Sequence, residues 1–362
     1  MTSGADPRPV LLVTNHVAPE RVPAFAALHR AEGVEVALWG GRLRHGVAPA
    51  TRADSLFFPT QSTSQHQLYA LASSRRFRAV ICGTGGRMGL PAAYVGARRA
   101  GVPFVLWASL WAQPRSLPGA AGYPILRWIY AHADAVASYG AHVSAYVRAR
   151  GARRVVEAPQ AVDNGFWSAR AEPERRAGFQ VLFAGRLEAE KGVEVLLDAW
   201  ARMDPDLADE RLVLAGRGPA AARAGQQPAV EAVGPLAPAE LRNFYAGSDV
   251  VVVPSLRTAT FREPWGLVVN EAFNQHVPVI ASDQVGAAAG GLVVDGATGL
   301  VVAAGDPGRL AAALRRLRDD RALGRRLGDG GAAAVSSQTP EAWAAGMRQA
   351  LALVGVSRSP DR

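Results

Sequence analysis

Short runs of aliphatic and β-branched residues alternate with segments of helical periodicity, and this alternation starts twice along the chain. In the first half, strand-like runs occupy 10–13, 34–38, 79–81 and 102–106, with helical segments such as 24–31 and 92–100 between them. In the second half, the strand-like runs are 181–184, 212–215, 250–253 and 277–280, with helical segments at 193–200, 240–246 and 265–274. Strands that alternate with helices form a parallel sheet covered on both faces. The sequence therefore predicts an α/β protein of two Rossmann-like, doubly wound parallel-sheet domains.

The polar stretch 169–178 has no apolar period and separates the two halves. We therefore predict an N-terminal domain over 1–168, a linker over 169–178, a C-terminal domain over 179–335, and a helix with a tail over 336–362. A long amphipathic stretch covers 128–150, and two last helices are predicted over 306–327 and 339–354. Thr339 suits the N-cap of the last helix and Pro340 its first turn. Its apolar stripe at 343, 347, 350, 351 and 354 requires a partner surface, which we place on the N-terminal domain.

Several patterns exclude other classes of protein. The one cysteine, Cys82, lies in an apolar run and cannot form an internal disulfide, so we expect a reducing, cytoplasmic compartment. No secretory signal pattern opens the chain, and no apolar window reaches the length of a membrane span. The run 83–89 fails the dinucleotide pattern because Met88 stands where glycine is needed. Asp204-Pro205-Asp206 is interpreted as a turn, and the seven histidines show no metal-ligand spacing, so we predict no metal.

Positive charge is concentrated in the first half of the chain. Residues 1–170 hold 19 arginines and 8 acidic residues, a net charge of +11, whereas residues 171–362 hold 21 basic and 23 acidic residues. This asymmetry indicates an anionic partner, either a phosphorylated acceptor, an acidic membrane surface or nucleic acid. Solvated surface arginine is the alternative. A nucleic-acid-binding module would interleave basic and aromatic residues on one element, whereas the arginine clusters at 75–78, 98–99 and 153–154 are scattered over several helices and loops, which argues against nucleic acid.

The only lysine of the chain, Lys191, lies in the segment 185–192 between a predicted strand and a predicted helix. The carboxyl ends of parallel strands form the ligand crevice of a doubly wound sheet, and basic residues there bind polyanions. Arg186 offers a planar fork for phosphate oxygens, and Lys191 a compact ammonium. The alternative, a merely solvated pair, is disfavoured because cations oppose the dipole at a helix N-terminus.

Two glutamates, Glu263 and Glu271, stand eight residues apart around Pro264. With Pro264 in the first helical turn, the two carboxylates would lie about 12 Å apart along the helix. The backbone amides of Gly266 and Leu267 would then lie between them and face a phosphate group. A solvated helix face is the alternative, and the nearby Arg186 and Lys191 favour phosphate.

Together these residues resemble a known family. The motifs are Gly185-Arg186 with Lys191-Gly192, Gly216 to Pro219, Ser248-Asp249, Pro254-Ser255, the two glutamates, and Asp295-Gly296 with Gly299-Leu300. They run from 181 to about 310 in family order and resemble the C-terminal domain of bacterial family 4 retaining glycosyltransferases, the group 1 glycosyltransferases of the GT-B fold. The N-terminal half resembles the family only loosely, chiefly through residues 160–166.

The resemblance implies a GT-B architecture, with two Rossmann-like domains facing a central cleft. Arg186 and Lys191 would bind the diphosphate of a nucleotide sugar, Glu271 the ribose and Glu263 the transferred sugar, with Gly185, Gly216, Gly266 and Leu267 completing the donor site. Catalysis would rest on Arg186, Lys191 and Glu263, without a metal or other cofactor. The sequence departs from the family at Asn274-Gln275-His276 and at 286–291, which lacks an acidic residue often found there.

The implied function is sugar transfer, with retention of configuration, from a nucleoside-diphosphate sugar to an acceptor hydroxyl. Candidates for the acceptor wall follow strand ends of the first half: Asn15, His16, Gly85, Trp107 and Trp111, the tryptophans having core packing as their alternative. With the basic first half, we expect an anionic or lipid-linked acceptor at the inner face of the cell membrane, in surface polysaccharide or glycolipid assembly. The alternatives are a GT-B epimerase or phosphorylase, glycosylation of a small secondary metabolite, and an inactive scaffold.

Overall fold

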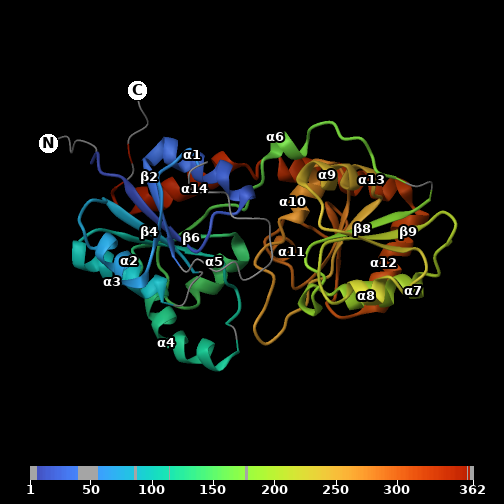
Figure 1. Cartoon of the computed structure of the whole chain (residues 1–362), viewed down its shortest axis with the longest axis horizontal. Helices are drawn as coiled ribbons and strands as arrows, with labels where there is room; N and C mark the ends of the chain where they lie inside the picture. Colours follow the sequence, from blue (N-terminus) through green and yellow to red (C-terminus); the bar gives the residue numbers. More distant parts are fainter. Residues whose placement is uncertain are drawn as a thin grey trace. The chain divides into compact units, whose positions relative to one another are not determined.

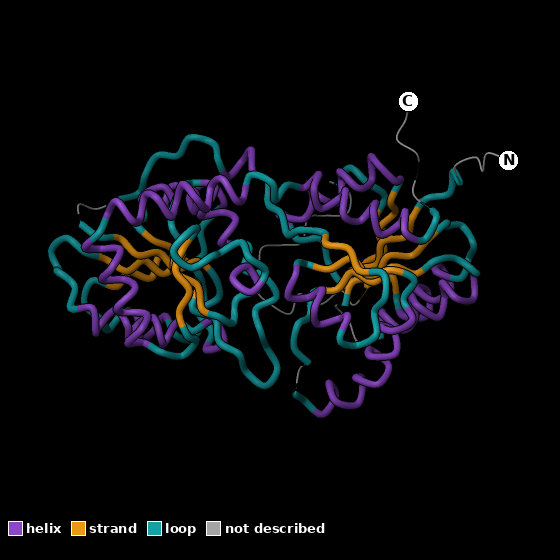
Figure 2. Tube along the Cα trace, turned by 180° about the vertical axis from the view of Figure 1, so that it is seen from behind, coloured by secondary structure: helices purple, strands orange, loops and turns teal. Residues whose placement is uncertain are grey.

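The computed structural model describes residues 6–39, 56–84, 88–113, 115–175, 178–356 and 358. Contacts within the chain define two compact units. Unit 1 comprises Met1–Asp163 and Thr339–Arg362, and unit 2 comprises Asn164–Gln338. In each unit, a central sheet lies between layers of helices (Figures 1 and 2).

The described part of unit 1 contains a sheet of seven parallel strands in the order β3-β2-β1-β4-β5-β6-β7. The strands are β1 (Val10–Thr14), β2 (Val34–Trp39), β3 (Thr60–Thr63), β4 (Ala79–Gly83), β5 (Phe104–Ala108), β6 (Ala135–Ser138) and β7 (Val155–Glu157). The helical elements are η1 (Pro19–Arg21), α1 (Val22–Glu32), α2 (Gln65–Ala72), α3 (Gly89–Ala100), α4 (Leu117–His132), α5 (Ala141–Arg148) and α14 (Pro340–Leu353).

Alternate side chains of these strands point to opposite faces, so unit 1 has two apolar layers. On one face, Leu12 and Ile81 pack with Phe25 of α1 and Trp343 of α14. Apolar residues of α2, α3, α4 and α5 pack against the other face. The last helix of the chain therefore completes the core of the unit in which the chain begins, and Figure 1 shows red α14 beside blue α1.

The described part of unit 2 contains six parallel strands in the order β10-β9-β8-β11-β12-β13. They are β8 (Gln180–Ala184), β9 (Arg211–Ala215), β10 (Val230–Gly234), β11 (Val250–Val253), β12 (Val279–Ser282) and β13 (Gly299–Val302). Around them lie α6 (Asn164–Trp167), η3 (Ala189–Lys191), α7 (Val193–Met203), α8 (Ala221–Ala224), α9 (Pro238–Gly247), α10 (Val268–Asn274), α11 (Gly286–Ala289), α12 (Pro307–Asp319) and α13 (Arg321–Val335). Apolar residues of α7 and α12 form one core with the sheet.

Three predicted elements differ from the structure. The stretch 128–150 is interrupted by strand β6, which is too short to show a period of its own. The predicted helix 306–327 is two helices, because Asp320 ends α12 and caps α13 by accepting a hydrogen bond from the Leu323 amide at 2.8 Å. The predicted helix 265–274 begins only at Val268, so Pro264 is not in its first turn.

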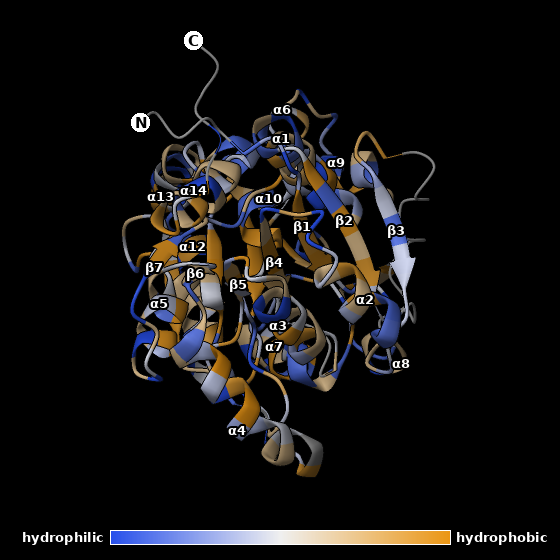
Figure 3. Cartoon of the chain, turned by 90° about the vertical axis from the view of Figure 1, so that its left-hand side faces the viewer, coloured by the Kyte–Doolittle hydropathy of each residue, from blue (hydrophilic) through white to orange (hydrophobic). Residues whose placement is uncertain are grey.

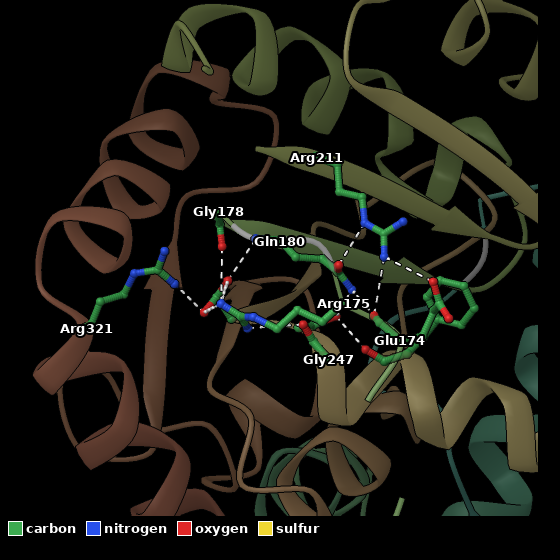
Figure 4. Close-up of polar contacts among 10 residues, drawn as sticks. Glu174, Arg175, Gly178, Gln180, Arg211, Gly247 and Arg321 are labelled. Atoms are coloured by element: carbon green, nitrogen blue, oxygen red, sulfur yellow. Dashed lines mark hydrogen bonds and ion pairs between the residues drawn. The ribbon is translucent and has the colours of Figure 1, made fainter. Parts of the chain in front are cut away.

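The predicted linker, 169–178, belongs to unit 2, where hydrogen bonds hold it to the rest of the unit. The Glu172 amide donates to the Asn243 side chain at 3.0 Å, and the Glu174 amide to the Asn243 carbonyl at 3.0 Å. Arg175 forms an ion pair with Asp249 at 3.1 Å, and Asp249 also accepts from the Gln180 amide at 2.8 Å. Figure 4 shows Arg175 and Gln180 of this network together with Arg211, at the first residues of β8 and β9. These strand ends are opposite to the loops described next.

Among the described helices, none combines the length and the apolar content needed to cross a bilayer.

Candidate functional site

The predicted donor residues of unit 2 follow the carboxyl ends of its parallel strands. The chain leaves β8 toward β9 and β10 on one side and returns to β11 on the other. Strand order therefore reverses between β8 and β11, and in open α/β sheets ligands bind outside the strand ends at such a point. The loops after β8 and after β11 flank this position.

Close backbone contacts shape these loops. A side chain at Gly216, which follows β9, would place its Cβ 1.8 Å from the Gly185 carbonyl oxygen. At Gly192, which precedes α7, a Cβ would lie 2.0 Å from the Pro254 carbonyl oxygen. The Leu256 amide donates to the Glu190 carbonyl at 2.9 Å and joins the loops after β8 and β11. Glycine at 192 and 216 thus lets segments from three strand ends meet.

Lys191 and Glu263 form an ion pair between the two loops. The Lys191 ammonium donates to Glu263 Oε2, which also accepts from the Ser255 hydroxyl at 3.0 Å. The Lys191 Nζ lies 5.1 Å from the ring centroid of Phe261, within range of a cation–π interaction. The ammonium has three N–H donors and Glu263 accepts from one of them, so Lys191 can bind the carboxylate and a phosphate together.

Arg186 has a different partner. Its guanidinium pairs with Glu190 at 2.6 Å, four residues along the same loop. The Arg186 and Glu190 side chains are 28% and 27% exposed, so both are accessible to a ligand. The structure brings Lys191 together with Glu263, whereas no contact within the described residues joins Arg186 to Lys191.

Glu271 occupies a buried position on α10. Its Oε2 accepts a hydrogen bond from the Tyr245 hydroxyl of α9 at 2.7 Å. Burial, and then the Glu271 charge, raise the pKa of Tyr245 well above its usual range, so Tyr245 stays protonated and remains a donor. Glu263 lies outside the helix, where it pairs with Val285 in a β-bridge. The predicted spacing of the two carboxylates along one helix is therefore wrong.

Gly266 and Leu267 lie between Glu263 and α10. Gly266 has a φ of +94°, in the left-handed region that favours glycine, and Leu267 is the N-cap residue of α10. The turn is fixed by its neighbour α11, where the Ala287 amide donates to the Trp265 carbonyl at 2.8 Å. The departure at 274–276 also has a structural role: Gln275 donates to the Ala169 carbonyl at 3.1 Å, and His276 adopts a φ of +57°.

The candidate acceptor residues of unit 1 divide into two groups. Asn15 and His16 are exposed after β1, with their side chains 3.1 Å apart. Trp107 is 6% exposed and packs edge-on against Phe25 and Trp343, as in the core-packing alternative. Trp111 is likewise buried in the apolar core of unit 1. Gly85 lies outside the described residues.

Sequence reasoning gave no role to Glu190, Ser255, Phe261 or Tyr245, although all four contact predicted site residues. Ser255 belongs to the Pro254-Ser255 motif, which was the one sequence feature that could have indicated its role. Within the ranges that the structure describes, no group of three or more His, Cys, Asp or Glu side chains is placed to hold a metal ion.

The family model described as Glycosyl transferases group 1 matches residues 178–320. D-inositol 3-phosphate glycosyltransferase of Corynebacterium diphtheriae is 39% identical over 181 residues, which are 45% of this chain and 39% of that protein. Alpha-D-kanosaminyltransferase of Streptomyces kanamyceticus is 33% identical over 175 residues, 45% of this chain and 43% of that protein. The chain thus spans about two fifths of the length of these curated relatives.

Solved structures are similar over nearly the whole chain. HepE from Anabaena, in complex with UDP and glucose, has a TM-score of 0.75 at 16% identity and covers 95% of this chain and 99% of its own. An E. coli structure described as trehalose-6-phosphate bound with UDP-2-fluoro glucose has a TM-score of 0.74 at 13% identity, covering 96% and 100%. At these identities the likeness establishes the fold. The chain has the GT-B fold, and its residues 178–320 are similar to the group 1 glycosyltransferases.

Proposed function

We propose that this protein is a retaining glycosyltransferase that moves a sugar from a nucleoside-diphosphate sugar to an acceptor hydroxyl. The observation that carries the proposal is the Lys191–Glu263 pair, held by Ser255 between two loops at the switch point of the unit 2 sheet. The match to group 1 glycosyltransferases over 178–320 supports it, as do the names of the relatives.

The charges of the site suit this reaction. When the bond between the anomeric carbon and the donor phosphate oxygen breaks, the leaving diphosphate gains negative charge. Cations that are already in place then stabilise the transition state more than the bound donor. We assign this role to Lys191 and Arg186, with the amides of Gly266 and Leu267 at the phosphates. Glu263 would bind hydroxyl groups of the transferred sugar, and Glu271 the ribose.

In the proposed reaction, the acceptor oxygen attacks the anomeric carbon on the face that the diphosphate leaves. The new bond joins the anomeric carbon to the acceptor oxygen, and the acceptor proton passes to a donor phosphate oxygen. This transfer keeps the configuration of the sugar and needs no protein nucleophile. Arg186 and Lys191 would neutralise the diphosphate, so we propose turnover without a metal.

For the acceptor, we propose an anionic, lipid-linked molecule at the inner face of the cell membrane, as in surface polysaccharide or glycolipid assembly. Counted over unit 1, the sequence has 21 arginines and 10 acidic residues, whereas unit 2 has 19 basic and 21 acidic residues. A surface of positive charge attracts anionic substrates. The relatives named for D-inositol 3-phosphate also point to a phosphate-bearing acceptor.

Nucleotide binding provides the first test. UDP, the nucleotide of the HepE complex, is compared with GDP, ADP and dTDP for its effect on the thermal midpoint. A nucleotide at 100 times its Kd adds about 2.7 kcal/mol to the stability of the native state. We expect Lys191→Ala to remove most of this gain, and Arg309→Ala, at an exposed cation of α12, to leave it unchanged. A full gain in Lys191→Ala would contradict the assignment of the site.

Product analysis provides the second test. The purified protein is incubated with the preferred nucleotide sugar, with and without phosphate-bearing acceptors, and the anomeric configuration of the product is read by NMR. We expect acceptor-dependent transfer with retained configuration and no loss on adding a chelator. An inverted product would exclude the retaining mechanism, and a donor epimerised without acceptor would establish the epimerase alternative.

A further inference from the structure

Helix α4 of unit 1 presents apolar side chains to solvent. Leu117 is 90% exposed, Ile125 52% and Trp128 49%. Ala120, Ala121 and Pro124 are also exposed. Residues 117, 121, 124, 125 and 128 recur at helical spacing and share one face, whereas Ile129 and Tyr130 are buried. A surface helix ordinarily turns polar residues outward, so α4 has the opposite pattern on its outer face.

The exposed tryptophan is held in place by its neighbours. Trp128 packs edge-on against Tyr94 of α3, with ring centroids 5.1 Å apart, and is stacked on His132 at 4.3 Å. Tyr94 is itself 5% exposed and belongs to the core of unit 1. The half-exposed indole is therefore a fixed feature of this surface. Figures 1 and 3 both show α4 extending away from the sheet of unit 1, and Figure 3 shows hydrophobic colouring along it.

Helix α4 itself contains no aspartate or glutamate. Residues 55–133 of the sequence contain eight arginines and no aspartate or glutamate. Arg115, two residues before α4, and Arg127, on the helix itself, are both exposed. An apolar face flanked by arginines complements a bilayer that contains anionic lipids. A second copy of the same face would instead bring arginines together, which opposes self-association through α4.

The helix is too short to cross a bilayer. It has 16 residues, and a spanning helix needs about 20. Helices with an apolar face and flanking cations lie in the plane of the membrane interface, where tryptophan rings are favoured.

We propose that α4 is a membrane-surface anchor whose outer face inserts at the headgroup boundary of a bilayer containing anionic lipids. Leu117, Ile125 and Trp128 enter the boundary region, and Arg115 and Arg127 bind lipid phosphates. Only the role of the anchor rests on the proposed function. That role is to hold unit 1 at the membrane surface that displays a lipid-linked acceptor.

Vesicle flotation of the full chain tests the anchor. Vesicles of phosphatidylcholine alone are compared with vesicles of equal parts phosphatidylcholine and phosphatidylglycerol, at low and high salt. We expect flotation only with the anionic vesicles, weakened by salt. The double variant Ile125→Ser/Trp128→Ser should reduce binding more than tenfold, whereas Leu207→Ser, at an exposed leucine of unit 2, should leave it unchanged. Arg115→Gln and Arg127→Gln should each reduce binding about fivefold, with Arg309→Gln as control.

A fluorescent label locates the contact. Cys82 is buried, so in Ile125→Cys an environment-sensitive thiol dye labels position 125 selectively. Anionic vesicles should shift the emission of this dye to the blue. The emission of the same dye on Leu207→Cys should not change. The anchor is wrong if the protein does not float at low salt, if the α4 variants float as well as the native chain, or if they abolish a dimer seen by sedimentation. Nucleotide-induced stabilisation, measured on the same variants, should persist, so failure of the anchor and failure of the proposed function are distinguishable.

Discussion

At the scale of single residues, the candidate site depends on glycines, which have no side chain. Gly216 and Gly192 let the loops after β8, β9 and β11 approach within contact of one another's carbonyl oxygens. Both glycines belong to the sequence motifs, but only the fold shows why glycine is required at these two positions. Lys191 stands out in the sequence because it is the only lysine, but its partner Glu263 is 72 residues away. A contact of that separation is created by the strand order, which local sequence patterns do not specify.

Gly216→Ala should therefore abolish nucleotide-induced stabilisation. A Cβ 1.8 Å from the Gly185 carbonyl oxygen forces the loop that carries Arg186 to move. Gly234→Ala is the matched control, because Gly234 ends β10 with a φ of +75° and a Cβ at this position would meet no atom within 4 Å. The control should lose only about 1 kcal/mol of unfolding free energy, because alanine is disfavoured in the left-handed backbone conformation. Thermal midpoints with and without nucleotide measure both effects, and equal behaviour of the two variants would refute the steric argument.

At the scale of secondary structure, apolar strands were predictable and polar or short ones were not. β1, β4, β8, β9 and β11 are buried on both faces and appear as continuous apolar runs. β3 consists of Thr60-Gln61-Ser62-Thr63 at a sheet edge, where none of its four residues is buried and no apolar run is required. The break between α12 and α13 was also missed, because the apolar period continues across Asp320 and only the cap interrupts it.

Asp320→Ala should destabilise the protein by about 1 kcal/mol, the usual cost of losing an N-cap. Its carboxylate accepts from the Leu323 amide at 2.8 Å, and no methyl group can replace that acceptor. Asp320→Asn keeps an acceptor oxygen and should retain most of the stability. Denaturant unfolding of the three proteins, with m-values compared, measures the difference. If Ala and Asn prove equally stable, Asp320 does not cap α13.

At the scale of the whole chain, unit 1 is built from both ends of the sequence. Residues Thr339–Arg362 return to the unit that Met1–Asp163 begins, and Trp343 stacks on Phe25 at 5.4 Å between ring centroids. The apolar stripe of the last helix predicts that it needs a partner, but the stripe does not identify the partner. The buried Glu32 of α1 also binds this segment, through Arg348 at 3.0 Å. Unit 2, by contrast, is one continuous segment that contains every predicted donor residue.

This organisation predicts that the two units unfold in separate steps. Trp343→Ala removes a fully buried ring from unit 1, and Trp200→Ala an equally buried ring from unit 2; each should cost its own unit about 3–5 kcal/mol. In calorimetry, Trp343→Ala should lower the transition temperature of unit 1. It should leave the transition temperature of unit 2, which bound nucleotide raises, unchanged. Trp200→Ala should lower the nucleotide-sensitive transition. A single transition that both variants lower equally would mean that the units unfold as one cooperative body, and that the C-terminal helix stabilises the donor site as much as the unit it completes.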